Sequence, residues 1–451
     1  MCCALALLAA SCSRGGSTST ASSSSSSGSA ASSASASSAS GTALADGGFG
    51  DLGKVCQPGS AKGATDVGVT DTDIHIGTVT DKGAEVRPEL NREMYDAAVA
   101  FAKWCNEKGG ILGRNVVIDD RDAKLFEYPQ RIADSCTTDL ALVGGGAVLD
   151  DDNDGTRVAC GLPNIPGYVV SATARTAALQ VQPIPNPVYK ANIGAYRALD
   201  KLTNGGMQAY GVMTAPLPST IVVRDALVES VGLAGGKVVY NAQYNTACET
   251  NWDPFVQDMK SKGVKVLEFV GEPECFTSLQ KQMDVTGFYP DVSIESANFY
   301  EEKYSLEGGK TAKSTYVRMA FTPFEMAADN KATQDYLDLM KQYNPSGKVA
   351  ILGEQALSGL LLFAQAATAC ESTLTRTCLL DKAKAIHDWS AGGLHAPTDP
   401  GNATPSPCFA LIKVGDGTFS YDKDATSPTN GIFNCDPSNV VELKNDYGVP
   451  R

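Results

Sequence analysis

The pattern of apolar and polar positions predicts strands and helices in alternation. Residues 74–79 are β-prone, and apolar residues then recur at three- or four-residue spacing from Met94 to Cys105, which places one apolar stripe along a helix. Gly109-Gly110 ends that helix, because glycine adopts the left-handed cap conformation easily. Residues 115–120 form a second extended run. Strand, helix and strand of this length make one βαβ unit of a parallel sheet.

The same alternation continues through most of the chain. Helices are expected at residues 126–138, 155–160, 188–202, 220–231, 251–262, 274–283, 330–343 and 352–369. Strands are expected at residues 141–143, 165–170, 209–213, 237–242, 264–269, 292–295, 315–320, 408–414 and 418–421. Such alternation predicts parallel sheets with helices on both faces, so the fold class is α/β. The strands are too many for one compact sheet, and two lobes are expected.

The opening unit resembles the start of the leucine/isoleucine/valine-binding proteins, which are type I periplasmic binding proteins of ABC transporters. The likeness lies in D-x-x-I-x-I-G at residues 71–77, N-E-K-G-G-I-L-G-R at 106–114 and V-V-I-D-D-R-D at 116–122. The resemblance implies two doubly wound Rossmann-like lobes joined by a three-stranded hinge. Lobe I would comprise residues 66–186 and 321–392, and lobe II residues 187–320 and 393–451.

The N-terminal region differs from the rest of the chain. Residues 2–10 form a short apolar segment. Ser11-Cys12 then resembles the end of a bacterial lipoprotein signal, whose cleavage leaves a lipid on Cys12. No Lys or Arg precedes Cys12, so residues 1–12 are interpreted as a signal remnant whose true start lies upstream; a secreted protein without lipid is the alternative. The serine-rich segment at residues 13–65 is expected to be a disordered linker.

Charge and hydropathy exclude two classes of partner. The chain has 37 Lys plus Arg against 51 Asp plus Glu, for a net charge of −14, and it has no basic run. Nucleic acid and anionic lipid headgroups are therefore poor partners. After residue 12 no apolar stretch approaches the roughly 18 residues of a membrane span.

The cysteines predict disulfides. Thirteen cysteines less Cys2, Cys3 and Cys12 leaves ten, and none forms a tight Cys/His cluster suited to a metal. Five disulfides in an oxidising compartment are the simpler interpretation. Spacing alone does not determine the connectivity, but the expected elements suggest the pairs Cys370–Cys378, Cys408–Cys435, Cys248–Cys275, Cys136–Cys160 and, by remainder, Cys56–Cys105.

Ligands bind outside the carboxyl ends of parallel strands. In lobe I the candidate residues in the loops after the strands are Thr80, Gly145, Ala147, Ser171, Ala172 and Thr173. The last three match the place where the resembled family uses S-x-A-T to hold an amino acid; an ordinary loop is the alternative. Residues 144–146 are glycines where that family has a serine-rich loop, which argues against an α-amino acid. Their amides could cradle an anion, or the glycines could serve close backbone packing.

In lobe II the resemblance points to an aromatic side chain and a glutamate that pairs with the ligand's ammonium group. Tyr189, Glu272 and Glu295 occupy helix or strand ends expected to face the cleft. For Glu295 an ordinary surface carboxylate is the alternative.

Metal and catalytic sites find little support. Asp150, Asp152 and Asp154 fit half of a calcium loop, but its twelfth position is Gly161 instead of a glutamate, so an acidic helix start is favoured. No G-x-S-x-G, no P-loop and no G-x-G-x-x-G after the first strand is present, and neither an enzyme nor a cofactor is expected.

The resemblance implies an extracytoplasmic, lipid-anchored receptor that captures a small amino-acid-like, amide or organic metabolite for an ABC permease and ATPase. We expect a monomer that contacts the membrane only through its lipid. A ligand-sensing extracellular module of a signalling system is the alternative function.

Overall fold

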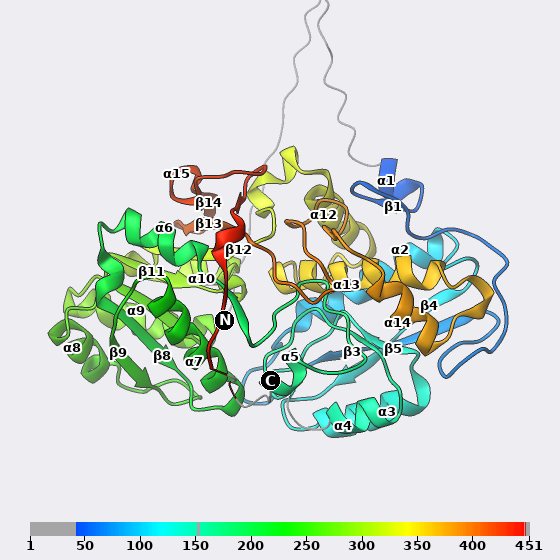
Figure 1. Cartoon of the computed structure of the whole chain (residues 1–451), viewed down its shortest axis with the longest axis horizontal. Helices are drawn as coiled ribbons and strands as arrows, with labels where there is room; N and C mark the ends of the chain where they lie inside the picture. The colour runs from blue at the N-terminus through cyan, green and yellow to red at the C-terminus, as the bar shows by residue number, and fades with distance from the viewer. Residues whose placement is uncertain (1–41, 151–153, 446, 448–451) are drawn as a thin grey trace, which may run out of the picture. The chain divides into compact units, whose positions relative to one another are not determined.

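The computed structural model describes residues 42–150, 154–445 and 447, so Cys12 and residues 1–41 lie outside it. Two main sheets organise the chain (Figure 1). The first is fully parallel, in the order β4 (Asn115–Asp122), β3 (Asp73–Thr80), β5 (Ala141–Val143), β6 (Asn164–Ile165). Its helices are α2 (Arg92–Glu107), α3 (Tyr128–Thr138), α4 (Asp154–Ala159), α5 (Ala172–Arg175), α12 (Lys331–Tyr343), α13 (Ile351–Thr368) and α14 (Arg376–Lys384).

Alternation along β3 explains how both faces of this sheet are buried. Ile74 and Ile76 belong to the apolar cluster that contains α2 and α13, whereas Val79 packs with α3 in a separate cluster. Successive side chains of a strand point to opposite faces, so one short strand serves both cores. The predicted α/β layering is confirmed.

The second sheet is mixed. Strands β9 (Val238–Gln243), β8 (Tyr210–Thr214), β10 (Val266–Val270), β11 (Val292–Glu295) and β12 (Thr315–Met319) are parallel, and β13 (Cys408–Val414), β14 (Phe419–Tyr421) and β15 (Asn434–Cys435) add antiparallel. The remaining helices are α6 (Gly194–Leu202), α7 (Pro218–Leu233), α8 (Asp253–Ser261), α9 (Pro273–Thr286), α10 (Glu302–Glu307), α11 (Gly309–Ala312) and α15 (Lys423–Thr426). None of these or the other described helices has the length and apolar composition that a bilayer crossing requires.

The chain passes between the two sheets through short antiparallel pairings. Strand β7 (Lys190–Asn192) pairs with β16 (Val440–Glu442), and Phe321 forms a separate bridge with His395. The Ala396 N–H donates to the Ala320 carbonyl and the Thr398 hydroxyl donates to the Pro183 carbonyl, at 2.7 Å each. Three segments thus run side by side between the sheets, as the expected three-stranded hinge requires.

One predicted helix is partly wrong. Residues 188–202 were expected to be helical throughout, but β7 occupies their beginning and α6 starts only at Gly194. The Asn192 carboxamide accepts the Gly194 N–H at 2.9 Å and donates to the carbonyls of Ser406 and Cys408. Ser406 and Cys408 lie more than two hundred residues from Asn192 in the chain, so the local sequence pattern does not predict these hydrogen bonds.

The predicted strand at residues 165–170 is also too long, since β6 ends at Ile165. Pro166 has no N–H to continue the ladder. A Cβ on Gly167 would lie 2.4 Å from the Met94 side chain, so the backbone passes too close to α2 for an ordinary strand residue.

The expected disordered linker ends earlier than residue 65. Phe49 is fully buried, β1 (Gly48–Phe49) pairs with β2 (Leu52–Lys54), and the Leu44 carbonyl accepts the Trp104 indole N–H at 2.9 Å. Together with the short helix α1 (Thr42–Ala45), this segment covers part of α2. Phe49 and Leu44 supply apolar surface that the serine-rich residues before position 41 lack, which is why this segment packs.

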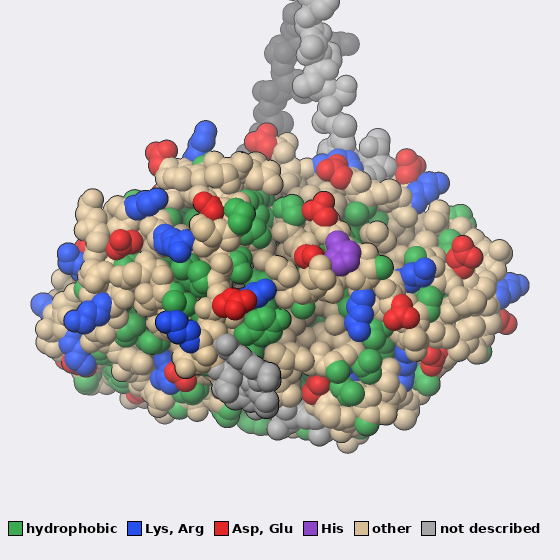
Figure 2. Space-filling model, viewed as in Figure 1, with side chains coloured by type: hydrophobic (Ala, Val, Ile, Leu, Met, Phe, Trp, Pro, Cys, Tyr) green, Lys and Arg blue, Asp and Glu red, His purple; other side chains and the backbone are tan. Residues whose placement is uncertain are grey.

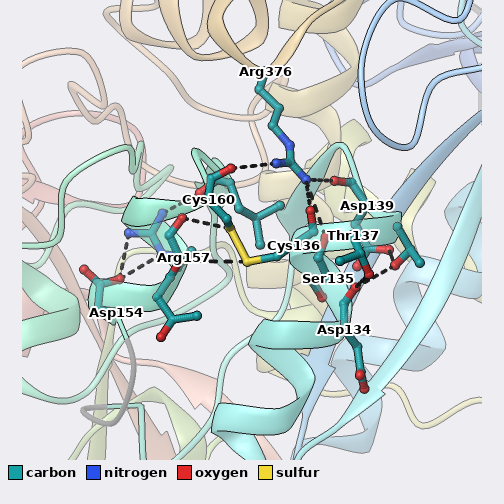
Figure 3. Close-up of a disulfide and its surroundings, with 12 residues drawn as sticks. Asp134, Ser135, Cys136, Thr137, Asp139, Asp154, Arg157, Cys160 and Arg376 are labelled. Carbon is teal, nitrogen blue, oxygen red and sulfur yellow. Dashed lines mark hydrogen bonds and ion pairs between the residues drawn. A yellow bond between two sulfur atoms is a disulfide. The ribbon is translucent and has the colours of Figure 1, made fainter.

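Five disulfides are present, and they are the expected pairs: Cys56–Cys105, Cys136–Cys160, Cys248–Cys275, Cys370–Cys378 and Cys408–Cys435. Figure 3 shows the Arg376 side chain reaching from α14 to the backbone around Cys136–Cys160. Its guanidinium donates to the carbonyls of Cys160 at 2.9 Å, Cys136 at 3.0 Å and Asp139. Arg376 therefore joins α14 to the ends of α3 and α4.

We predict that Arg376→Ala lowers the free energy of unfolding by about 2–3 kcal/mol, because it leaves buried carbonyls without a donor. Urea denaturation at constant pH measures this loss. Arg131→Ala, which removes an arginine from the surface of α3, should cost less than about 1 kcal/mol. Equal losses in the two variants would contradict the structural role of Arg376.

Candidate functional site

A buried carboxylate organises the carboxyl end of the first sheet. Asp81 follows β3 and is fully buried, and it accepts the N–H groups of Leu125 and Val148 at 2.8 Å each. Burial raises its pKa against the opposing effect of these two donors. Asp81 thus ties together the loops after β4 and β5. Its neighbour Thr80, a predicted site residue, is also fully buried, and its hydroxyl has no hydrogen-bond partner among the described residues.

The glycine loop is closely packed. A Cβ on Gly145 would lie 2.4 Å from the Val79 nitrogen, and one on Gly146 would lie 2.8 Å from the Tyr168 ring. The Gly146 N–H donates to the Val79 carbonyl at 2.9 Å. Of the two alternatives for this loop, the geometry matches close backbone packing. Gly145 and Ala147 line a cavity of only about 20 Å³, which has room for about one water molecule.

Ser171 serves the start of a helix. Its hydroxyl accepts the Ala174 N–H at 3.1 Å and caps α5, and its own N–H donates to Asp150 at 2.8 Å. Ala172 is partly exposed and Thr173 is exposed. Asp150 also accepts the Val170 N–H, so this carboxylate holds the loop after β6. Among the described residues, which omit Asp152, no group of three or more side chains suited to a metal ion occurs.

The residues predicted from lobe II are scattered. Tyr189 is 39% exposed beside β7. Glu295 is fully buried at the end of β11, where its carboxylate accepts the Phe269 N–H at 3.2 and 3.3 Å, and burial raises its pKa well above the ordinary value. The structure thus places Glu295 inside the sheet, where neither the expected cleft position nor a surface role applies. Glu272 lies before α9, within reach of the first lobe.

An ion pair connects the two sheets' loops at Glu272. Arg87, in the loop after β3, contacts Glu272 at 2.7 Å and Glu274 at 3.0 Å. The Asn298 carboxamide also donates to Glu272 at 3.4 Å. A guanidinium of the protein itself therefore occupies the position that was predicted for a ligand's ammonium group. The sequence analysis did not name Arg87. Its position in the loop after the first strand, at the edge of the sheet where ligands bind, was the feature that could have identified it.

A second ionic cluster lies between the same parts of the chain. Lys348, just before α13, contacts Glu93 of α2 and Glu301, which precedes α10, at 3.4 Å each. Both carboxylates raise the pKa of Lys348 against the effect of burial. Lys348 therefore carries a positive charge that links α2 to the lobe II side.

Glu354 is a buried carboxylate of a different kind. It lies in the first turn of α13, is fully buried, and neither of its oxygens has a hydrogen-bond partner among the described residues. Burial raises its pKa well above the ordinary value. Sequence reasoning did not identify it, because the surrounding helix reads as uniformly apolar.

The surface offers no continuous patch of one charge on the face that Figure 2 draws. Acidic and basic side chains are interspersed there over both parts of the chain. This face therefore gives a polyanionic partner nothing to recognise.

One family model matches most of the chain. The model of the periplasmic binding protein family matches residues 73–418. No curated protein matches the chain. Similar solved structures include a fatty acid ABC transporter substrate-binding protein from Thermomonospora curvata, 15% identical, covering 80% of this chain and 95% of the other, with a TM-score of 0.66.

Two further similar structures are of proteins named for branched-chain amino acids. A leucine-binding protein from Thermotoga maritima is 13% identical and covers 77% of this chain and 97% of the other, with a TM-score of 0.63. A branched-chain amino acid transporter substrate-binding protein from Streptococcus pneumoniae, solved with isoleucine, is 16% identical and covers 78% and 99%, also with a TM-score of 0.63. At these identities the likeness shows a shared fold.

We predict that Arg87→Ala destabilises the protein more at pH 8 than at pH 5, by about 1–2 kcal/mol at the higher pH. Burial raises the pKa of Glu272 and Arg87 lowers it, so the variant leaves an ionised, partly buried carboxylate at pH 8 that protonation relieves at pH 5. Thermal denaturation at both pH values measures the difference. Arg131→Ala, which disrupts pairs with the more exposed Glu127 and Asp134 on α3, should show no such pH dependence; a similar loss at both pH values in Arg87→Ala would contradict the prediction.

A second prediction concerns Glu354. Its pKa is higher in the folded than in the unfolded state, so the wild-type protein loses stability as the pH rises from its unfolded pKa through its folded pKa. Glu354→Gln removes this loss and should be about 1–3 kcal/mol more stable than wild type at pH 8, with little difference near pH 4. Urea denaturation across this range measures it. The exposed Glu302→Gln serves as control, and a Glu354→Gln protein that is less stable at pH 8 would refute the argument.

Proposed function

The chain belongs to the periplasmic binding protein family, and from that premise we propose that it is the extracytoplasmic solute receptor of an ABC importer. The observation that carries this proposal is the family match over residues 73–418, which spans the first sheet, the second sheet from β8 to β13 and all three of the proposed crossings between them. Proteins of similar structure are named for the transport of amino acids or fatty acids, which supports a small organic solute as ligand.

The receptor would work by closing on its solute. Interactions made only in the closed form supply the free energy of closure. Arg87 with Glu272, and Lys348 with Glu301, would be ionic contacts of this kind, because each joins the proposed lobe I to the proposed lobe II. No bond of the solute is broken in this cycle, so the protein would not act as an enzyme.

The solute would be an amino-acid-like, amide or organic metabolite. Thr80 remains a proposed contact, because its buried hydroxyl lacks a partner among the described residues. Gly145, Ala147, Ser171, Ala172 and Thr173 would form the wall behind it, and Tyr189 and Glu295 would contact the solute only after a rearrangement.

A lipid on Cys12 followed by the serine-rich linker would hold the receptor at the outer face of the cell membrane. Its partners would be the permease and ATPase of the importer. The lobe boundaries at residues 66–186 with 321–392, and 187–320 with 393–451, stay proposals, as does a monomeric state.

The alternative is a sensor that delivers the same closing motion to a membrane receptor. The adjacent genes separate the two functions: permease and ATPase genes favour import, and a kinase gene favours sensing.

We predict that a thermal-shift screen of the full chain against amino acids, amides and small organic acids identifies a stabilising ligand. A ligand at 100 times its dissociation constant adds about 2.7 kcal/mol to stability, which raises the unfolding midpoint measurably. Phosphate and nucleotides serve as negative controls. If no member of the three classes raises the midpoint, the proposed solute class is wrong.

A further inference from the structure

A cavity of about 370 Å³ lies at the carboxyl ends of β11 and β12. Ser296 follows β11, Met319 ends β12, Ala191 belongs to the crossing strand β7, and residues of α7 close another wall. Ligands of parallel sheets bind at this edge. A cavity of roughly 150 Å³ suffices for benzene, so this one has room for a larger organic molecule.

The wall of the cavity is largely apolar. The apolar side chains that contribute to it include Ala226 and Leu227 of α7, Met319, Phe409 and Leu443. These side chains come from a helix, two strands and the segment after β16, so the apolar surface surrounds the space from several directions. Such a wall favours the hydrocarbon part of a ligand.

The charged groups of the cavity are all cationic. Arg175, Lys190 and Arg318 line it, and none of the described residues that line it is an aspartate or a glutamate. The protein as a whole carries a net charge of −14, so this distribution opposes the average composition. Arg318 is neutralised by Glu268, whose carboxylate lies 2.7 Å away.

Arg175 forms no ion pair among the described residues; Asp150 acts on its charge only from beyond ion-pair distance. The side chain is 8% exposed, and its donors reach the Asn186 carbonyl at 2.7 Å, the Asn186 carboxamide oxygen at 2.9 Å and the Pro187 carbonyl at 3.3 Å. Its Nη1 donates to no described residue, and no described carboxylate lies within 4.0 Å of the guanidinium. Burial lowers the pKa of Arg175 to about 10, so the group stays charged at neutral pH.

Two other buried arginines show what a purely structural arginine looks like in this protein. In Arg114 the three nitrogens donate to the carbonyls of three different residues. In Arg157 each nitrogen reaches Asp154 or a backbone carbonyl. The guanidinium of Arg175 keeps one nitrogen without an acceptor. The structural Arg376 also leaves its Nε without a partner among the described residues, so the feature that points to a ligand at Arg175 is its place on the cavity wall.

We propose that this cavity binds an apolar organic acid, with the acid's carboxylate paired to Arg175 and its hydrocarbon part against the wall formed by α7 and Phe409. This assignment rests on the receptor function proposed above and names its solute class. The ammonium group of an α-amino acid would meet only cations among the charged side chains of this wall, so the acid carries no charged amine.

Isothermal titration of the full chain tests the assignment with butanoate, hexanoate, octanoate and benzoate. At least one of these acids should bind, and its uncharged amide should bind at least tenfold more weakly. Arg175→Gln should weaken binding of the acid at least tenfold and leave binding of the amide unchanged. Arg92→Gln, on the surface of α2, is the matched control and should bind as wild type does.

A second variant guards against a folding defect in Arg175→Gln. Ala226→Phe fills the cavity from α7 without touching the arginine, and it should weaken acid binding at least tenfold while circular dichroism and the unfolding midpoint stay as in wild type. Acid binding that survives both substitutions overturns the site. If none of the acids binds while an amino acid or amide does, the assignment fails and the receptor function stands; if nothing binds, both fail.

Discussion

The loops at the carboxyl ends of the parallel strands depend on one constraint: backbone N–H groups that leave the ladder must find acceptors away from water. Buried carboxylates meet this need here. Asp81 accepts two loop amides, Asp150 accepts two more, and Glu295 accepts that of Phe269. The hydrogen bonds that each carboxylate accepts offset the free energy lost when it is buried, and they hold the backbone in place. The buried carboxylates at the expected ligand site therefore already accept hydrogen bonds from the protein's own backbone.

The fold could be predicted as far as local periodicity reaches. The alternation of strands and helices and the α/β class follow from spacing and element order, and the expected elements suggested the five cysteine pairs that the structure contains. The start of α6 could not be predicted, because β7 exists only through its pairing with β16. The packing of Phe49 was missed for a related reason: this aromatic residue among glycines gains its burial from α2 and α12, which a local window does not include.

The candidate site was less predictable than the fold. Sequence position placed Glu272 at a strand end, yet its partner Arg87 comes from a different sheet's loop. Glu295 occupies the expected strand end, but its carboxylate turns to the neighbouring strand's amide. The direction of a side chain at a strand end depends on which acceptors and donors its neighbours leave unmatched. That information is tertiary, so residue type and spacing alone identify the edge of the sheet and not the contacts made there.

The buried arginines of this molecule differ in how completely protein acceptors surround them. Taking a guanidinium out of water is costly unless carbonyls or carboxylates replace the lost hydration. Arg114 and Arg157 obtain that replacement at every nitrogen, and Arg318 obtains it from Glu268 and Tyr196. Arg175 obtains it only in part, beside a cavity that no described carboxylate lines. A buried charged group that lacks some of its hydrogen-bond partners is typical of functional sites, where a ligand supplies the missing partner.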